Sequence, residues 1–344
     1  MKVEYPSGEY ELIEAIRRHL PENSGTAYEE AIGDDAAVRV NRIAGEKLII
    51  TADISVENVH FSVDTMSLEE VGYRAMVSNL SDCASMGAAP DSAVVQLVFP
   101  RGEPGLHKKV EEIYRGFGRA CRKWNFPLVG GDLSCGPVWT LGITLIGRID
   151  AGARVLKRKG IRAGDVLWVT GMPGESAAGF AALKHWGRDG VPERFARLVN
   201  AHVSPVPRIE QGLALARSVE VHSMMDLSDG LSKDVATLCF ENDLGFLFDD
   251  LNGSAGSELL NLSGELKMNW ADWFFHGGEE YELLFAAQGG FDPCQLPEFS
   301  ELIPVRLGCF TEEFRGVRVQ FTDGTVGELP GRSWDHVKES CKRP

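Results

Sequence analysis

Thr51-Ala52-Asp53-Ile54-Ser55-Val56-Glu57 continues the apolar run Leu48-Ile49-Ile50, which predicts a buried strand that leads into acidic residues. Five further segments place carboxylates beside glycine or serine: Ile32-Gly33-Asp34-Asp35-Ala36-Ala37, Asn79-Leu80-Ser81-Asp82, Gly130-Gly131-Asp132-Leu133-Ser134, Asp226-Leu227-Ser228-Asp229-Gly230 and His276-Gly277-Gly278-Glu279-Glu280-Tyr281-Glu282. Any one of them alone would usually be a turn, because Asp and Gly are common turn residues. Several follow an apolar strand, however, so we expect their acids to converge at one edge of a sheet.

Converging carboxylates need compensating charge. Two carboxylates about 4 Å apart repel each other by roughly 4 kcal/mol at an effective dielectric constant near 20. Four or more would not stay ionised together without bound cations. The acids lie near no cluster of thiols or imidazoles in the sequence, and oxygen ligands of this kind favour Mg²⁺, which usually binds together with phosphates. We therefore predict an acidic site that binds an anionic nucleotide through metal ions.

The common nucleotide-binding motifs are missing from the sequence. Residues 171–176 lack the lysine of a G-x-x-x-x-G-K-[ST] loop, and no G-x-G-x-x-G follows the first strand. The H-R-D and D-F-G triplets of protein kinases are absent as well. Gly116-Phe117-Gly118 lies in a predicted helix and has no third glycine. The sequence thus argues against the ordinary nucleotide-binding frameworks.

Composition limits the partners. The 344 residues carry 35 Lys plus Arg against 50 Asp plus Glu, a formal charge of −15, which argues against nucleic acid or an anionic membrane as the main partner. No apolar run reaches the roughly 18 residues of a membrane span, and the start of the chain shows no secretory signal. The seven cysteines are scattered and include no C-x-x-C pair. We expect a cytoplasmic protein with reduced thiols.

Hydrophobic periodicity predicts alternating helices and strands in two α/β regions. Ser67 and Glu70 form a capping box before a helix that runs towards Met86. The segment 147–164 is rich in Gly, Arg and Lys, so we place a domain junction there. Further helices are predicted at about 8–20, over 110–124 and from Glu175, and strands at 48–51, 93–99, 127–129, 140–149 and 166–170.

The ordered motifs resemble those of a known family. They are Gly33-Asp34-Asp35-Ala36, the Asp53/Glu57/His60-Phe61 stretch, Asn79-Leu80-Ser81-Asp82 through Met86-Gly87-Ala88, Gly130-Gly131-Asp132, Asp226 to Leu231, Gly277-Gly278-Glu279 through Phe285, and Trp334-Asp335-His336. In this order, over nearly the whole chain, they resemble the thiamine-monophosphate kinases. These enzymes belong to a superfamily that includes aminoimidazole ribonucleotide synthetase, selenophosphate synthetase and a hydrogenase-maturation dehydratase.

The resemblance implies a two-domain α/β (α+β) fold like that of aminoimidazole ribonucleotide synthetase. Residues 1–150 would form an N-terminal domain with a mixed sheet, which binds ATP and Mg²⁺ and forms a homodimer. Residues 151–344 would form a C-terminal α/β domain that covers the ATP cleft. The implied reaction is direct transfer of the ATP γ-phosphoryl group to thiamine monophosphate, with several Mg²⁺ ions and no phosphoenzyme.

The resemblance also implies roles for individual residues. The expected Mg²⁺ ligands are Asp35, Thr51, Asp53, Asp82, Asp132, Asp226 and Asp229, with Asp34 and Ala52 as candidates for additional contacts. The expected ATP contacts are Tyr114, Gly131, Asp132, Arg158 and Ser228. The expected substrate contacts are His60, Glu279 and Trp334. Without the resemblance, His60, Tyr114 and Trp334 would be read as ordinary packing or surface residues.

The chain departs from the family pattern at four positions. Ala52 stands in place of Thr, Leu133 in place of Thr, Asn58 in place of Gly and Glu280 in place of Asp. Two other functions therefore stay open: another ATP-dependent synthetase of the superfamily, and a nucleotide-binding protein without activity. Retention of so many aspartates argues against the second, because an inactive site has no reason to keep like charges together.

Overall fold

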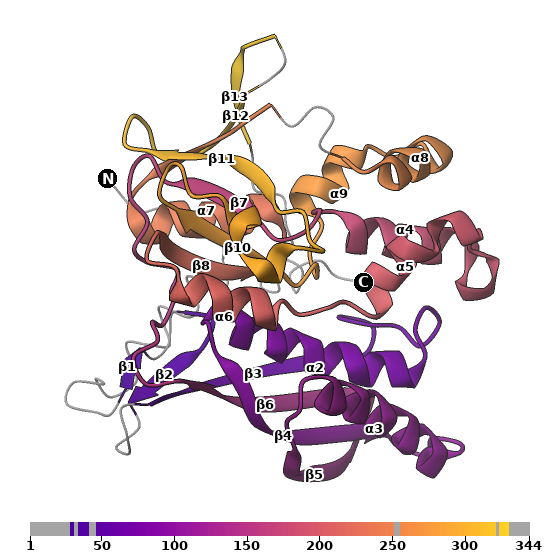
Figure 1. Ribbon diagram of the computed structural model, residues 1–344. Coiled ribbons are helices and arrows are strands. Elements are labelled where there is room, and N and C mark those ends of the chain that lie inside the picture. Colours follow the sequence, from indigo (N-terminus) through magenta and orange to yellow (C-terminus); the bar gives the residue numbers. More distant parts are fainter. Residues whose placement is uncertain (1–27, 31–33, 41–45, 251–254, 321–322, 330–344) are drawn as a thin grey trace.

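The structure is a computed structural model that describes residues 28–30, 34–40, 46–250, 255–320 and 323–329. Two sheets dominate the described chain, as Figure 1 shows. The first has the strand order β1-β2-β3-β6-β4-β5, in which only β4 and β5 are parallel. Its strands are β1 (Tyr28–Glu30), β2 (Ala37–Val40), β3 (Lys47–Val56), β4 (Ala89–Pro100), β5 (Leu128–Gly136) and β6 (Thr140–Ile149).

The second sheet has the order β13-β12-β9-β11-β7-β10-β8, and the one parallel pair in the described strands is β12 with β9. Its strands are β7 (Val166–Val169), β8 (Val221–Leu227), β9 (Gly245–Phe248), β10 (Glu282–Ala287), β11 (Val305–Thr311), β12 (Gly316–Gln320) and β13 (Val326–Glu328). Strand β10 is buried along its whole length because its two faces pack into two hydrophobic cores, one with Leu283 and Phe285 and the other with Leu284 and Ala286.

Helix α2 (Leu68–Ser85) lies between the two sheets (Figure 1). It contacts β3 and β6 of the first sheet and β8 and β10 of the second, so almost all of its residues are buried. One hydrophobic core therefore continues from the first sheet through α2 to β8 and β10. The other helices are α3 (Leu106–Lys123), α4 (Glu175–Trp186), α5 (Ala196–Val203), α6 (Ile209–Arg217), α7 (Leu231–Asn242), α8 (Ser257–Leu266) and α9 (Trp270–His276).

The local signals in the sequence give the elements that they predict. The capping box is present, with the Ser67 side chain accepting from the Glu70 amide and the Glu70 carboxylate accepting from the Ser67 amide. The predicted strands overlap β3, β4, β5, β6 and β7, and the predicted helices overlap α2, α3 and α4. The helix predicted at about 8–20 lies outside the described residues.

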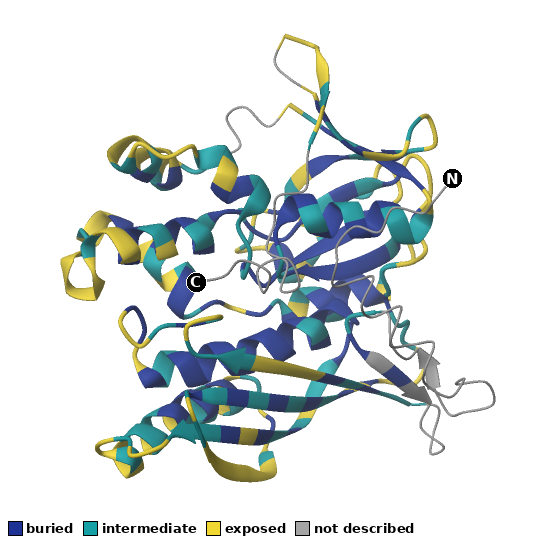
Figure 2. Ribbon diagram, turned by 180° about the vertical axis from the view of Figure 1, so that it is seen from behind, coloured by how far each residue is buried: buried dark blue, intermediate teal, exposed yellow. Residues whose placement is uncertain are grey.

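The first sheet is covered by helices on one face only. The register aligns Ile54 with Gly142, Gly142 with Gln96 and Gln96 with Asp132, so these four residues share one face. Ile54 is 58% exposed, which shows that this face is open. Among the described strands, β2 pairs with β3 only as far as Ile50, so residues 51–56 have a free edge, and β5 has another. Figure 2 shows the exposed surface of β5 at the bottom of the molecule.

Helices α2 and α3 approach closely through a pair of glycines. A Cβ on Gly72 would lie 2.2 Å from the carbonyl oxygen of Ile113, and a Cβ on Gly116 would lie 2.0 Å from that of Glu69. Both neighbours are backbone atoms in helices, which cannot move aside as a side chain would. Within the described residues, no helix is long and apolar enough to cross a membrane.

This contact predicts that Gly116→Ala destabilises the protein by about 1–3 kcal/mol, because the added methyl group forces the two helices apart. Gly118→Ala is the matched control on the same helix, since a Cβ there meets only the end of the Arg122 side chain, at 3.0 Å. The control is expected to be neutral or up to about 1 kcal/mol more stable, because Ala favours a helix over Gly. Urea unfolding measures both free energies; equal values for the two variants would contradict the close contact.

Candidate active site

Six aspartates from four segments of the chain come together between the two sheets, and we call them the aspartate cluster. Asp34 and Asp35 directly precede β2, Asp53 lies on β3, Asp82 lies on α2, and Asp226 and Asp229 lie at the end of β8 and just beyond it. Their charges act on one another: Asp53, Asp226 and Asp35 each raise the pKa of Asp82. The convergence does not follow from strand ends alone, because Asp53 lies within a strand and Asp82 within a helix.

Burial makes the charges in this cluster unfavourable. Burial first, and the nearby Asp35 second, raise the pKa of Asp226 to about 8. The same two causes raise the pKa of Asp34 to about 7. The pKa of Asp82 also lies well above its usual value, again through burial first. Asp53 is exposed when the whole residue is considered, but burial of its carboxylate raises its pKa. The charges of Asp229 and Asp35 raise it further. The cluster thus has a shortage of positive charge.

Neighbouring side chains hold the cluster in place. Thr51 donates its hydroxyl to Asp82 in a short hydrogen bond, and Ser81 donates to Asp226 at 2.9 Å. Ser228 also donates to Asp226, at 3.4 Å. The cluster is therefore shaped by hydroxyl groups from β3, α2 and the segment after β8.

Two cations contact the cluster within the described chain. Arg158 pairs with Asp35: its Nε donates to Asp35 Oδ1 at 2.8 Å, and its Nη2 makes a shorter contact with the same oxygen. The backbone amide of Arg158 also donates to Asp34, at 3.2 Å. Lys233 pairs with Asp229 at 2.6 Å. Two cations facing six aspartates leave an excess of negative charge.

The donor atoms fit a magnesium ion in chemistry, although the side chains do not enclose one by themselves. Asp35 Oδ2 is buried and has no hydrogen-bond partner among the described residues, so it is an oxygen ready to accept a cation. In the described parts of the chain, no three Asp, Glu, His or Cys side chains are arranged to hold a metal ion. Mg²⁺ commonly keeps water and phosphate oxygens as ligands and needs only one or two carboxylates. The cluster therefore suits metal ions that arrive together with phosphates.

Asp234 shapes the loop of the cluster and was not found from the sequence. It is buried on α7 (Leu231–Asn242), and its Oδ2 accepts hydrogen bonds from the amides of Asp229 and Gly230, each at 3.2 Å. These bonds fix the backbone that carries Asp229. The sequence did offer one signal for this role. Asp234 follows Asp229 closely and lies one helical turn after Gly230, at the start of a helix.

Arg74 joins two of the residues that were expected to contact substrate. It is buried on α2, its Nη2 pairs with the Glu279 carboxylate, and its Nη1 donates to the carbonyl oxygen of His60 at 2.9 Å. The His60 ring is held as well, since Nδ1 accepts from the amide of Val56 at 3.1 Å. Sequence reasoning missed Arg74, because an arginine in a predicted helix gives no sign of a buried partner more than 200 residues away.

Asp132 lies apart from the aspartate cluster within one chain. Its register partner is Gln96 on the open face of the first sheet, whereas Asp53 aligns with Ile143 and, through it, with the buried Val95 on the helix-covered face. Ala52 is exposed and, one residue from Asp53, points to the open face as well. A single chain therefore does not gather all the expected metal ligands.

The structure shows what surrounds Gly131 and Tyr114, two of the expected ATP contacts. Gly131 lies so close to β4 that a Cβ would be 2.0 Å from the carbonyl oxygen of Val95. Tyr114 packs on α3 with its ring edge-on to Phe117, at 5.3 Å between centroids. Trp334, expected on the substrate side, lies outside the described residues.

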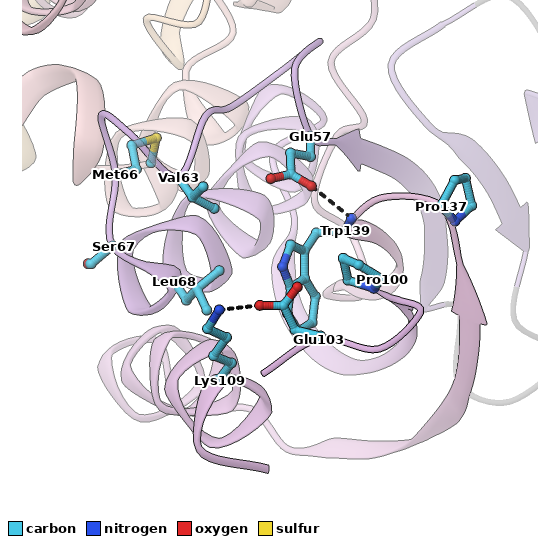
Figure 3. Close-up of a pocket in the computed structure, with 10 residues that line it drawn as sticks. All are labelled: Glu57, Val63, Met66, Ser67, Leu68, Pro100, Glu103, Lys109, Pro137 and Trp139. Atoms are coloured by element: carbon cyan, nitrogen blue, oxygen red, sulfur yellow. Dashed lines mark hydrogen bonds and ion pairs between the residues drawn. The ribbon is translucent and has the colours of Figure 1, made fainter. Parts of the chain in front are cut away.

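A pocket of about 390 Å³ lies elsewhere, at the end of the first sheet (Figure 3). Figure 3 shows Trp139 between two polar contacts: its amide donates to Glu57 at 3.1 Å, and Lys109 pairs with Glu103. The other lining residues are Val63, Met66, Ser67, Leu68, Pro100 and Pro137. None of the clustered aspartates lines this pocket, and its charged groups already have partners.

Comparison with known proteins identifies the family. "AIR synthase related protein, N-terminal domain" matches residues 33–149, and the C-terminal domain of the same description matches residues 162–290. A thiamine-monophosphate kinase of Corynebacterium glutamicum is 32% identical over 282 residues, which covers 82% of each chain. The chain belongs to the thiamine-monophosphate kinase family.

Other members of this family are similar to the chain over most of its length. The thiamine-monophosphate kinase of Salmonella typhimurium is 34% identical and covers 81% of this chain and 82% of its own. A solved structure described as AaThiL complexed with AMPPCP and TMP superimposes with a TM-score of 0.80 at 28% identity. The superposition covers 96% of this chain and 97% of the other, so the two-sheet fold is that of the family.

Two departures from the family pattern have a local explanation. Asn58, in place of Gly, adopts φ 63°, a left-handed conformation that Asn tolerates better than most residues. Glu280, in place of Asp, is buried and accepts hydrogen bonds from backbone amides of α4. Leu133 is 55% exposed on β5, and its surroundings in one chain do not explain it.

The Arg158–Asp35 pair predicts a measurable coupling. Arg158→Met should lower the free energy of unfolding by about 3 kcal/mol, because it leaves a buried carboxylate without its counter-charge. Adding Asp35→Asn should recover part of the loss, so the double-mutant cycle should give a coupling free energy above about 1 kcal/mol. Urea unfolding of the wild type, both single variants and the double variant provides the cycle. Additive effects would show that the two side chains do not depend on each other.

Proposed function

We propose that this chain is a kinase that transfers the γ-phosphoryl group of ATP to thiamine monophosphate and forms thiamine diphosphate. The observation that carries this proposal is the buried aspartate cluster with Arg158 at its edge, in a chain of this family. The solved structure of AaThiL in complex with AMPPCP and TMP, which is 28% identical to this chain over nearly its whole length, supports ATP and thiamine monophosphate as the two substrates.

Mg²⁺ ions held by Asp35, Asp53, Asp82, Asp226 and Asp229 would neutralise the phosphates and keep donor and acceptor in line. The protein groups around them have simpler tasks. Thr51 and Ser81 orient the carboxylates of Asp82 and Asp226 through the hydrogen bonds described above. Arg158 places a positive charge beside Asp35, where the polyphosphate of ATP would approach. An acceptor phosphate is already an anion at neutral pH, so the chain needs no strong general base.

We assign the binding site of the phosphate acceptor, thiamine monophosphate, to the region around Arg74. Glu279 and the His60 turn meet there, next to the backbone of Leu227 and Ser228 that leads into the aspartate cluster. The 35% exposure of the Glu279 side chain leaves it accessible to a ligand, while Arg74 beneath it is only 5% exposed. A carboxylate suits the cationic thiazolium ring of thiamine monophosphate. Trp334 stays a prediction for the same ring.

A homodimer would complete the set of ligands. Residues 51–56 of β3 and the whole of β5 present free edges, and unpaired edges with exposed apolar side chains are surfaces for strand addition. Val129 and Leu133 on β5 are 63% and 55% exposed. Pairing β5 of one copy with β3 of another would carry Asp132 and Gly131 towards the partner's Thr51 and Asp53.

The proposal also includes a domain boundary and a cellular compartment. We place the domain boundary near residue 150, between β6 and β7. The six cysteines in the described residues are free, which supports a reducing compartment such as the cytoplasm.

The test is release of ADP with thiamine monophosphate, free thiamine and aminoimidazole precursors as alternative acceptors. The proposal expects release with thiamine monophosphate alone. Release with an aminoimidazole precursor would favour another synthetase of the superfamily, and binding of ATP without release in any arm would favour a protein without activity.

Metal dependence is the second expectation. EDTA should abolish ADP release and excess Mg²⁺ should restore it. Asp82→Asn and Asp226→Asn should each lower kcat at least a hundredfold while the protein stays folded, because each variant relieves charge repulsion. Circular dichroism and urea unfolding serve as controls for folding. Full activity of both variants would rule out the cluster as the metal site.

The dimer gives a separate expectation. Leu133→Glu should weaken self-association at least tenfold, because a carboxylate would be buried where β5 meets the second copy. Val219→Glu is the matched control, since Val219 is 72% exposed and lies away from the first sheet. Sedimentation velocity over a concentration series measures both. A wild-type protein that sediments as a monomer at all concentrations would contradict the proposal.

A further inference from the structure

The segment 277–281 between α9 and β10 has an unusual backbone. Glu279 has φ 63° and Tyr281 has φ 55°, so two bulky residues adopt the left-handed conformation on either side of Glu280. Residues other than glycine keep this conformation only where their surroundings hold it, and such positions concentrate at functional sites. The question is what holds this segment.

Backbone contacts hold one side of the segment. The amide of Glu279 donates to the carbonyl oxygen of Ser228 at 2.6 Å, and the amide of Tyr281 donates to that of Leu227 at 2.9 Å. Gly278 allows the close approach, because a Cβ there would lie 2.7 Å from the same Ser228 oxygen. The segment therefore lies directly against the backbone between Asp226 and Asp229.

The Glu280 side chain holds the other side. Its Oε1 accepts from the amide of Gly174 at 3.0 Å, and its Oε2 accepts from the amide of Ser176 at 3.1 Å. The N-cap of α4 is Gly174, which has no side chain to do this, so a carboxylate from more than 100 residues away caps the helix. Glu280 is only 7% exposed, and burial raises its pKa to about 8 against the opposing effect of the Ser176 and Ala177 amides.

The anchored segment sets the position of Glu279. With Glu280 fixed on α4 and the backbone fixed on Leu227 and Ser228, the Glu279 side chain is directed to Arg74. Arg74 in turn holds the carbonyl oxygen of His60. Movement of Glu280 would therefore displace Glu279 and disturb its pairing with Arg74.

We propose that Glu280 is a positioning residue for the phosphate acceptor: by capping α4 it holds Glu279 in the left-handed conformation that presents its carboxylate to the acceptor. This rests on the proposed function, since it assumes that Glu279 contacts the acceptor. Glu280 is buried and bonded to amides of α4, so it acts only through Glu279, and its removal should affect acceptor binding and leave ATP binding nearly unchanged.

The experiment compares Glu280→Gln with the wild type. An amide of the same shape would turn its NH₂ group towards the amide of Gly174 or Ser176, which are also donors. We expect KM for thiamine monophosphate to rise at least tenfold, and KM for ATP to change less than twofold. Glu280→Asp keeps a carboxyl group and restores the residue of the family pattern, so it is the rescue control, and its acceptor KM should stay within about threefold of wild type.

Glu175→Gln is the matched control. Glu175 lies in the first turn of the same helix but pairs with Arg197 at 2.7 Å, so this variant removes a carboxyl group from the helix start without breaking a contact of the anchored segment. Both KM values of this variant should stay within twofold of wild type. A tenfold rise in its acceptor KM would assign the effect to helix charge and overturn the positioning role.

Direct binding separates this inference from the proposed function. Calorimetric titration with thiamine monophosphate, in the presence of a non-hydrolysable ATP analogue and Mg²⁺, is run on wild type, Glu280→Gln and Glu280→Asp. Absence of binding by the wild type would contradict the proposed acceptor. Equal affinity of Glu280→Gln and the wild type would overturn the role of Glu280, even if Glu280→Gln lowers the melting temperature. Should Glu280→Gln fail to fold, Glu280→Met, which cannot accept these hydrogen bonds, takes its place in the titration.

Discussion

Helix α2 carries a line of polar side chains in a position where almost nothing reaches water. Arg74, Ser78, Ser81 and Asp82 recur at helical spacing on a helix whose other residues pack against both sheets. A buried polar group is unfavourable unless it is bonded, so each of these side chains requires a partner. The partners come from both sheets. Asp82 accepts a hydrogen bond from Thr51 of the first sheet. Ser81 donates to Asp226 of the second sheet, and Arg74 pairs with Glu279, which lies just before β10 of that sheet. The relative position of the two sheets is thereby fixed by hydrogen bonds as well as by apolar packing.

The same arrangement explains why the site needs ligands of opposite charge. Acids from both sheets are brought towards α2, and the pKa values of Asp34, Asp82 and Asp226 all rise. Arg158 offsets only part of this: its charge lowers the pKa values of Asp34 and Asp226, but burial has the larger effect on both. Without cations, several of these carboxyl groups would hold protons near neutral pH. A cluster tuned in this way gains favourable charge interactions only when cations enter it.

The sequence predicted local structure better than it predicted contacts. The capping box of Ser67 and Glu70 and the periodicity of α3 depend on neighbours a few residues away, so both could be inferred directly. The acids of the cluster were found because each stands beside a small residue in a short segment. Arg74 and Glu280 were assigned no role, since Glu279, which pairs with Arg74, and Gly174, which donates to Glu280, each lie more than 100 residues away. Asp132 shows the reverse problem: its motif is clear, but the register places it on the face away from Asp53.

The burial of α2 between two sheets also has a consequence for synthesis on the ribosome. The first sheet and α2 are complete once residue 149 has emerged, but β8 and β10, which cover the other side of α2, extend to residue 287. At roughly 5–20 residues per second, that leaves a gap of about 7–30 s. During this interval the nascent chain exposes an apolar helix surface together with Arg74 and Ser81, whose partners Glu279 and Asp226 have not yet been synthesised. The chain is therefore most vulnerable to aggregation as a half-made polypeptide, and chaperones that bind exposed apolar helices would act on it at this stage.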